Sequence, residues 1–248
     1  MTEVWSCGGG TQSAAIAVLI VQGRLPKPDI SVIVDTEREK STTWKYLDEV
    51  IAPNLAAVGV EVIRIPKSRY ATVDLYGGES DDALLIPAFT TQSGEVGKLP
   101  TYCSVEWKQR VVQRYLRECG VEEARVWVGI SRDEMSRIRA PRLQWLRERY
   151  VLLYDVPMYR SECVYLVTHI MGWPKPPRSA CWMCPNMSDE EWREMEPGDF
   201  KKAVQFEREI RKRDNFVFLH ELGKPLDQVD FTDRQGKITG CDSGYCFV

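Results

Sequence analysis

Apolar and polar segments alternate along the first half of the chain, with lengths that suit strands and helices in turn. A short apolar run ends at Val4 and Trp5, residues 13–22 form a longer apolar run, and residues 30–35 read ISVIVD. Short runs rich in Val and Ile are typical of buried strands, whereas longer apolar runs favour helices. The pattern therefore predicts a strand, a helix and a second strand.

The same alternation continues beyond residue 40. Residues 41–55 carry a helical stripe of Trp44, Leu47, Val50 or Ile51, and Leu55. Residues 60–65 predict a strand, residues 108–119 a helix, and the run VWVGI at 126–130 a further strand. Strands that alternate with helices form a mostly parallel sheet with helices on both faces. We therefore expect an α/β fold.

Two changes in the pattern divide the chain. Residues 70–102 are rich in Gly, Ser and Thr, which is typical of a mobile or substrate-facing loop. After Pro157 the chain becomes rich in proline and cysteine, as in WPKPPRSACWMCP, and charged helices follow. The sequence thus predicts an α/β domain of residues 1–157 and a small cysteine-rich helical part of residues 158–248.

Local signals mark the starts of two helices in this second part. Ser188 followed by Glu191 has the spacing of a capping box. Asp199 precedes FKKAVQFEREIRKR and is predicted to cap that helix.

Composition narrows the classes of protein. The chain has 248 residues, of which 28% are charged and 44% hydrophobic, and its net charge is −3. This is a globular composition, and only a local basic surface would attract nucleic acid. No apolar run approaches the roughly 18 residues of a membrane span, and no signal-peptide pattern is present. We expect a cytoplasmic protein with no membrane partner.

The stretch SCGGGTQS, Ser6 to Ser13, offers the first candidate chemistry. Three glycines between a strand and a helix serve equally well as a tight turn or as a cradle in which backbone amides approach a phosphate. The stretch matches neither a Walker loop nor the GxGxxG dinucleotide pattern. Taken alone, the stretch favours neither the tight turn nor the phosphate site.

Polar side chains follow the second predicted strand. Asp35, Thr36 and Glu37 come directly after it, at the edge where open α/β sheets bind ligands. A carboxylate there would hold a ribose hydroxyl or position a metal ion, or it would cap the next helix. Together with the glycines, these residues favour a nucleotide site.

A third polar cluster follows the strand at 126–130. The stretch GISRDEMSRIRAPR contains Gly129, Asp133, Glu134 and Arg137, and residues 132–149 hold six arginines against three acidic residues. Glu134 and Arg137 are three apart, so they would also pair as solvated neighbours on a helix. A local excess of arginine suits a phosphorylated substrate or a nucleic-acid backbone.

Cysteines supply the second candidate chemistry. Cys181 and Cys184 form CWMC, a spacing that lets two thiolates converge on one metal ion, although core cysteines or a redox dithiol remain alternatives. Cys103 and the tail pair Cys241 and Cys246 would be needed for a full ligand set. For Cys7, Cys119 and Cys163, buried or incidental thiols are the preferred interpretation.

Several motifs in a fixed order resemble the phosphoadenosine phosphosulfate (PAPS) reductase family. They are SCGGGTQSAA, VDTE with TTWKYL, YCSVEWK, VGISRDEMSR, SACWMCP with SDEEW, and FLHELGKPL, and they span nearly the whole chain. That family belongs to the PP-loop adenine nucleotide α-hydrolases, and the chain looks most like its cysteine-rich phage and bacterial members. The resemblance implies a HUP-type fold.

The resemblance also assigns residues. It implies nucleotide binding by Ser6, Gly8, Gly9, Gly10, Gln12 and Ser13 of the PP-loop and by Asp35, Thr36, Gly129 and Asp133, with Glu134 and Arg137 as catalytic residues. It implies Cys103, Cys181, Cys184 and Cys246 as ligands of a [4Fe–4S] cluster, with Cys241 as the substitute for Cys246 and Zn²⁺ as the rival metal. In the PP-loop pattern SGGxDS, this chain has Gly8 and Gln12 in place of the first serine and the aspartate, so the carboxylate that the pattern associates with magnesium placement is absent from the loop.

Three functions are compatible with these residues. The first is an ATP- and Mg²⁺-using enzyme that attacks the α-phosphate and releases pyrophosphate, in sulfur-related chemistry on DNA or tRNA with a sulfur-donor protein as partner. The second is a PAPS or adenylyl-sulfate reductase, although the chain has neither an ECGxH ending nor adjacent cysteines. The third is a non-catalytic nucleotide- or nucleic-acid-binding protein.

Overall fold

The computed structural model describes residues 1–77, 83–138 and 143–232. Within the described residues, the chain forms two compact units: unit 1 comprises Met1–Ala71 and Trp107–Ser179, and unit 2 comprises Thr72–Glu106 and residues 180–232. The chain passes from one unit to the other after Ala71, Glu106 and Ser179. The predicted domain boundary at 157 stays a prediction. Each unit is described by itself.

Unit 1 is built on a five-stranded parallel sheet with the order β3-β2-β1-β8-β9. The strands are β1 (Thr2–Ser6), β2 (Ile30–Asp35), β3 (Val62–Pro66), β8 (Ala124–Trp127) and β9 (Leu146–Arg149). In chain order this is 3-2-1-4-5, so the direction of winding reverses between β1 and β8. In open sheets of this kind, ligands bind beyond the carboxyl ends of the strands at that reversal.

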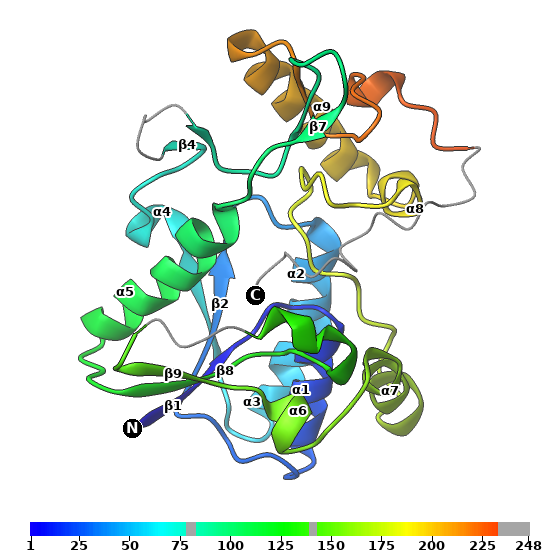
Figure 1. Ribbon diagram of the computed structural model, residues 1–248. Helices are drawn as coiled ribbons and strands as arrows, with labels where there is room; N and C mark the ends of the chain where they lie inside the picture. Colours follow the sequence, from blue (N-terminus) through cyan, green and yellow to red (C-terminus); the bar gives the residue numbers. More distant parts are fainter. Residues whose placement is uncertain (78–82, 139–142, 233–248) are drawn as a thin grey trace. The chain divides into compact units, whose positions relative to one another are not determined.

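Helices cover both faces of the sheet (Figure 1). On one face lie α1 (Thr11–Val21), the run α2 (Ser41–Tyr46), η1 (Leu47–Ile51) and α3 (Ala52–Ala56), then α6 (Val151–Tyr154), α7 (Arg160–Tyr165) and η4 (Leu166–Ile170). On the other lie α4 (Lys67–Tyr70) and α5 (Arg110–Glu118). The π-helical segment η2 (Val105–Gln109) directly precedes α5 in the chain. The predicted α/β fold with a mostly parallel sheet is confirmed, and it is compatible with a HUP-type fold.

Side chains of the central strands alternate between the two cores. Trp5, Ile33 and Trp127 pack under α1, whereas Val4 and Val126 pack under α5. This alternation follows from the two-residue period of a strand. Helix α1 lies between the sheet and the outer helices and is buried on all sides, which its uncharged sequence TQSAAIAVLIV permits.

Strand β9 was not expected from the sequence, because LRER contains no apolar run, and at the sheet edge its two end residues are half-buried and its two middle residues exposed. Ion pairs of Arg149 hold β9 in place. Arg149 Nη1 donates to Glu3 Oε2 at 3.1 Å, and Arg149 Nη2 donates to Asp155 Oδ1 at 2.5 Å. Edge strands commonly carry such charged side chains.

Within its described residues, unit 2 contains short strands and two helices. Strands β4 (Tyr76–Gly77) and β5 (Ala83–Leu84) pair with each other, and β10 (Val217–Phe218), β6 (Phe89–Thr90) and β7 (Gly97–Lys98) form an antiparallel sheet. The helices are α8 (Asp189–Arg193) and α9 (Pro197–Arg213), followed by the turn η5 (Leu226–Gln228). The segment predicted as a loop at 70–102 therefore carries four two-residue strands within its described part.

The two predicted helix starts have different outcomes. The capping box of α8 is present, since Glu191 N donates to Ser188 Oγ at 3.3 Å and Ser188 N to Glu191 Oε2 at 3.0 Å. The predicted Asp199 cap is wrong. Helix α9 begins at Pro197, a residue suited to the first helical position, so Asp199 lies inside the first turn and pairs with Lys202 at 3.0 Å.

Between β8 and β9 lies a 3₁₀ segment, η3 (Arg132–Arg137). Strand β8 ends at Trp127, so residues 128–130, predicted as strand, form the turn that leads into η3.

Candidate nucleotide site at the carboxyl edge of the sheet

The glycine loop leaves the carboxyl end of β1 and enters α1. Cys7 N donates to Val32 O at 2.7 Å, which extends the pairing of β1 with β2 by one residue. Gly8 N donates to the Ser13 hydroxyl at 2.8 Å, so Ser13 fastens the loop from the first turn of the helix. Burial raises the pKa of the Cys7 thiol to about 11, so this cysteine is a neutral core residue of the loop, as expected.

Two positions of the loop require glycine because side chains from other segments approach them closely. Gly9 has a φ of 73°, and a Cβ there would lie 2.7 Å from Thr43 Cγ2. A Cβ on Gly10 would lie 3.2 Å from the Ser179 Cβ. Beneath Gly9, the buried Thr43 Oγ1 has no hydrogen-bond partner within the described part of the chain. The loop is therefore a tight cradle whose shape tolerates no side chain.

Some backbone N–H groups at the start of α1 donate to no acceptor within the described residues. Helix α1 begins after Gly10 with no side-chain cap, and no acidic residue stands in its first turn. Across residues 1–77, 83–138 and 143–232, no acceptor is recorded for the amides of Gly10, Thr11 or Gln12. A helix start with unsatisfied amides and a positive partial charge is a site for an anion, above all a phosphate.

The carboxyl end of β2 forms a tight turn next to the loop. Asp35 Oδ1 accepts from Glu37 N at 2.7 Å, and Thr36 is fully buried. This hydrogen bond closes an Asx-type turn and places Glu37 at a φ of 62°. Of the interpretations offered for Asp35, helix capping is wrong, because α2 begins only at Ser41. Its contact with a nucleotide stays a prediction.

A cationic cluster at the ends of β2 and β3 was missed by the sequence reasoning. The Lys67 ammonium is almost fully buried, 3.5 Å from Glu37 Oε2 and 4.9 Å from the centre of the Trp107 ring. The Arg38 guanidinium lies 5.1 Å from the same ring. Hydrogen bonds from Ser68 lower the pKa of Glu37, so its carboxyl is ionised and balances Lys67. The signal in the sequence was a lysine two residues after a predicted strand.

The end of β8 meets the first turn of α1. A Cβ on Gly129 would lie 3.2 Å from Gln12 Cβ, so glycine lets the two segments touch. Gln12 Nε2 donates to Glu134 Oε2 at 3.0 Å and to the buried Ser131 hydroxyl at 3.3 Å. Arg137 Nη1 donates to Glu134 Oε1 at 2.9 Å. Gln12, Glu134 and Arg137 thus form one polar network at the point where the winding of the sheet reverses.

This network corrects one interpretation. The Glu134–Arg137 pair is present, but the two side chains are only 16% and 10% exposed, so it is not a solvated surface pair. Asp133, predicted beside the nucleotide, accepts from Arg160 N at 2.9 Å and so holds the start of α7. Its nucleotide-binding role stays a prediction.

A proline-rich arm, residues 174–179, passes beside the loop. Tyr46 Oη donates to Pro174 O at 2.9 Å, and Ser179 Oγ donates to Glu39 Oε1 at 2.9 Å. Glu39 is also 4.0 Å from Lys108 Nζ. These bonds fix the arm where Ser179 limits the space at Gly10.

The predicted metal ligands fall partly outside the described residues. Cys184 N donates to Cys181 O at 3.0 Å, which closes a turn and keeps the two thiols on one short segment, and Cys103 N donates to Leu85 O at 3.0 Å. In the described ranges, no three His, Cys, Asp or Glu side chains are arranged to hold one metal ion. Cys241 and Cys246 lie outside those ranges, so the four-cysteine site stays a prediction.

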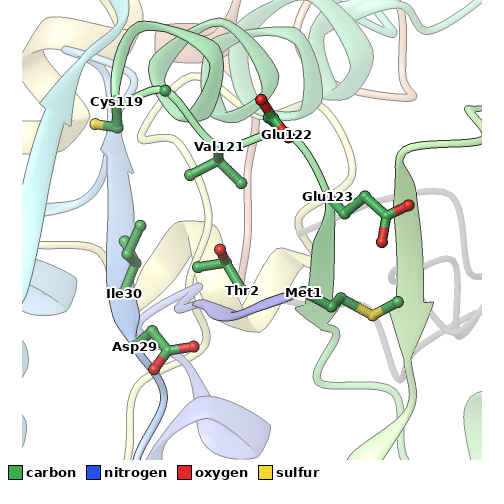
Figure 2. A pocket seen from close by; sticks show the side chains of 9 residues that line it. Met1, Thr2, Asp29, Ile30, Cys119, Val121, Glu122 and Glu123 are labelled. Atoms are coloured by element: carbon green, nitrogen blue, oxygen red, sulfur yellow. The ribbon is translucent and has the colours of Figure 1, made fainter.

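The pocket drawn in Figure 2 is not part of this site. It is lined by Met1, Thr2, Asp29, Ile30, Cys119, Gly120, Val121, Glu122 and Glu123. These residues lie at the amino ends of β1, β2 and β8, the edge opposite the glycine loop, and the carboxylates among them give the wall a negative charge. Such a pocket is unsuited to a nucleotide.

Among the described residues, no helix is long and apolar enough to cross a bilayer.

Comparisons with known proteins give little further guidance. No family model matches the chain, and no curated protein matches it. Among solved structures, the chain is similar to the U34-tRNA thiolase NcsA from Methanococcus maripaludis, solved with its [4Fe–4S] cluster, with a TM-score of 0.44 and 11% sequence identity. The match covers 86% of this chain and 66% of NcsA, slightly less than two thirds. At this level of similarity, activity has to follow from the residues of the site.

Proposed function

We propose that the chain binds an adenine nucleotide at the carboxyl ends of β1, β2 and β8 and activates an acceptor by attack on the α-phosphate. The observation that carries the proposal is the glycine cradle. Its amides at Gly10, Thr11 and Gln12 have no acceptor in the described structure, and they stand at the start of a buried helix where the winding reverses.

The residues present fit a triphosphate. Gly9 and Gly10 let the loop pack closely on Thr43 and Ser179, while the amides of Gly10, Thr11 and Gln12 have no acceptor among the described residues. The amides and the helix dipole would neutralise phosphate charge, and Arg137, held by Glu134 beside Gln12, would add a cation. Mg²⁺ that arrives with ATP would neutralise further charge on the phosphates.

The reaction is a substitution at phosphorus. An oxygen or sulfur of the acceptor forms a bond to the α-phosphorus, and the bond from that phosphorus to the bridging oxygen breaks. Pyrophosphate leaves with the electron pair, and the proton of the acceptor passes to water. Catalysis of such transfers rests on positioning and on neutralising the developing oxygen charge, which the amides and Arg137 are suited to provide.

The acceptor class belongs to the same proposal. The motif resemblance to the PAPS reductase family suggests sulfur-related chemistry, with DNA or tRNA as the molecule modified and a sulfur-donor protein as partner. The arginine-rich segment supports this in part. Arg132 is exposed and lies over the Tyr159 ring at 4.8 Å, a pairing of cation and aromatic ring that nucleic-acid bases and phosphates can use.

Pyrophosphate release tests the activity. Purified protein should bind ATP in calorimetry and release pyrophosphate from it when tRNA or DNA is added. Arg137→Met should lower the rate roughly hundredfold or more, the loss typical of removing one charge-stabilising donor. Arg147→Met, an exposed arginine on β9, is the matched control and should keep the rate. Absence of ATP binding, or equal loss in both variants, would contradict the proposal.

A [4Fe–4S] cluster on Cys103, Cys181, Cys184 and Cys246 completes the proposed function. When bound, such a cluster would supply an iron site for sulfur chemistry. Anaerobically purified protein should contain iron and inorganic sulfide and show broad visible absorption that bleaches on reduction. Cys181→Ser and Cys184→Ser should lose the iron, whereas Cys119→Ser, at an exposed thiol after α5, should keep it. Colourless protein with stoichiometric zinc would overturn the cluster in favour of Zn²⁺.

A further inference from the structure

The amide at position 12 is set by a partner far away in the sequence. Gln12 lies in the first turn of α1 and reaches Glu134 in η3, 122 positions along the chain, at 3.0 Å. An ionised carboxylate only accepts hydrogen bonds, so the side of Gln12 that faces Glu134 must be its NH₂ group. A carboxylate at position 12 would place two acceptors at hydrogen-bond distance.

Glu134 joins this amide to a cation. Its Oε2 accepts from Gln12 and its Oε1 accepts from Arg137 at 2.9 Å, so one carboxylate holds both side chains. The three side chains are only partly exposed, and Ser131, which also accepts from Gln12, is fully buried. A bond between charged groups in such a setting is strong and directional.

Resting on the proposed nucleotide site, we propose that Glu134 is the carboxylate of this site and that Gln12 and Glu134 are positioning residues for Arg137. Gln12 fixes Glu134 against the first turn of α1, and Glu134 in turn fixes the Arg137 guanidinium. The ligand class that this arrangement recognises is the phosphate chain of a nucleotide. Arg137 is the catalytic residue of the three, because it alone carries the positive charge that would contact phosphate.

The network explains the composition of the loop. The amides at the start of α1 and the Arg137 cation attract phosphate, and a second carboxylate beside Glu134 would cancel that attraction. A donor at position 12 adds no charge and turns Glu134 toward Arg137. Gln12 is therefore a functional part of the site.

An exchange of the two side chains tests the proposal. Gln12→Glu should weaken ATP binding roughly tenfold to hundredfold, because it leaves two facing acceptors. The double variant Gln12→Glu with Glu134→Gln restores one donor and one acceptor at the same total charge and should recover most of that affinity. Gln144→Glu adds the same charge at an exposed position and should change little.

The readouts separate positioning from folding. Binding of ATP and of adenosine is measured by calorimetry, and thermal unfolding is recorded for every variant. A defect in phosphate recognition lowers the affinity for ATP and leaves that for adenosine unchanged, whereas a folding defect lowers both and the melting temperature with them. For pyrophosphate release, Glu134→Gln should lower kcat more than it raises KM, because Arg137 stabilises charge that develops during the reaction.

The outcomes are distinct. If the wild-type protein binds no nucleotide, the proposed function fails and the inference falls with it. If the wild type binds ATP but Gln12→Glu binds it equally well, or if the exchange is as weak as the sum of the single variants, the positioning role is wrong and the nucleotide site stands.

Discussion

Replacing Gly9 by alanine is the sharpest test of the glycine cradle. Gly9 has a φ of 73°, a conformation that costs a residue with a Cβ roughly 1–2 kcal/mol. The new Cβ would also lie 2.7 Å from Thr43 Cγ2, well inside contact distance, and relief of such crowding in a packed site costs about 1–3 kcal/mol. Gly9→Ala should therefore destabilise the protein by about 2–5 kcal/mol.

A second glycine separates the two contributions. Gly23, just beyond the other end of α1, has a φ of 68°, and a Cβ there would meet no atom within 4 Å. Gly23→Ala therefore carries only the conformational cost, about 1–2 kcal/mol. The difference between the two variants isolates the crowding against Thr43.

Urea denaturation followed by tryptophan fluorescence gives the free energies of unfolding, and calorimetry gives ATP affinity. Thr43→Ser removes Cγ2 but keeps the hydroxyl, so it should restore part of the stability lost in Gly9→Ala and should not rescue Gly23→Ala. Equal losses in the two glycine variants, or no rescue by Thr43→Ser, would falsify the tight packing of the loop on Thr43.

Three further outcomes follow from individual contacts. Because burial raises the pKa of Cys7 to about 11, its thiolate is scarce at lower pH, and alkylation followed by mass spectrometry should label the exposed Cys119 far faster than Cys7 up to about pH 10. Tyr46→Phe removes the hydrogen bond to Pro174 and should cost about 1 kcal/mol in urea denaturation; no loss would contradict the anchoring of the arm. Ser188→Ala should lower stability by roughly 0.5–2 kcal/mol through the capping box, and Ser188→Asp should restore it.

Elements whose cause is local could be predicted from the sequence. Strand β2 has the predicted bounds 30–35, because a continuous run of Val and Ile is stable only where both faces of a sheet are covered. Helix α1 was expected from residue 13 and begins at Thr11, two residues closer to the glycines. The capping box of Ser188 depends only on Ser188 and Glu191, three residues apart, so it could be predicted directly from the sequence.

Features that depend on distant partners could not be predicted. Strand β9 has no apolar run, and its place at the edge depends on pairing with β8 and on the bond from Arg149 to Glu3, 146 positions away. The burial of Lys67 depends on Trp107, which another segment brings to the end of β3.

The error at Asp199 had a local cause. Pro197 starts the helix two residues earlier, and this signal was present in the sequence.

The glycine loop shows why a comparison of motifs position by position is a poor guide to this site. Judged by the pattern SGGxDS, Gln12 is the loss of a carboxylate and suggests a loop that has lost its chemistry. In the structure, that position faces a carboxylate that η3 supplies, and a second one would repel it. The charge near a phosphate depends on all the residues around it. In the proposed site the carboxylate therefore stands on η3, as Glu134, and its neighbour in the loop, Gln12, is a donor instead of an acceptor. The exchange of residues 12 and 134 tests this reasoning directly, since it reverses that arrangement within one protein.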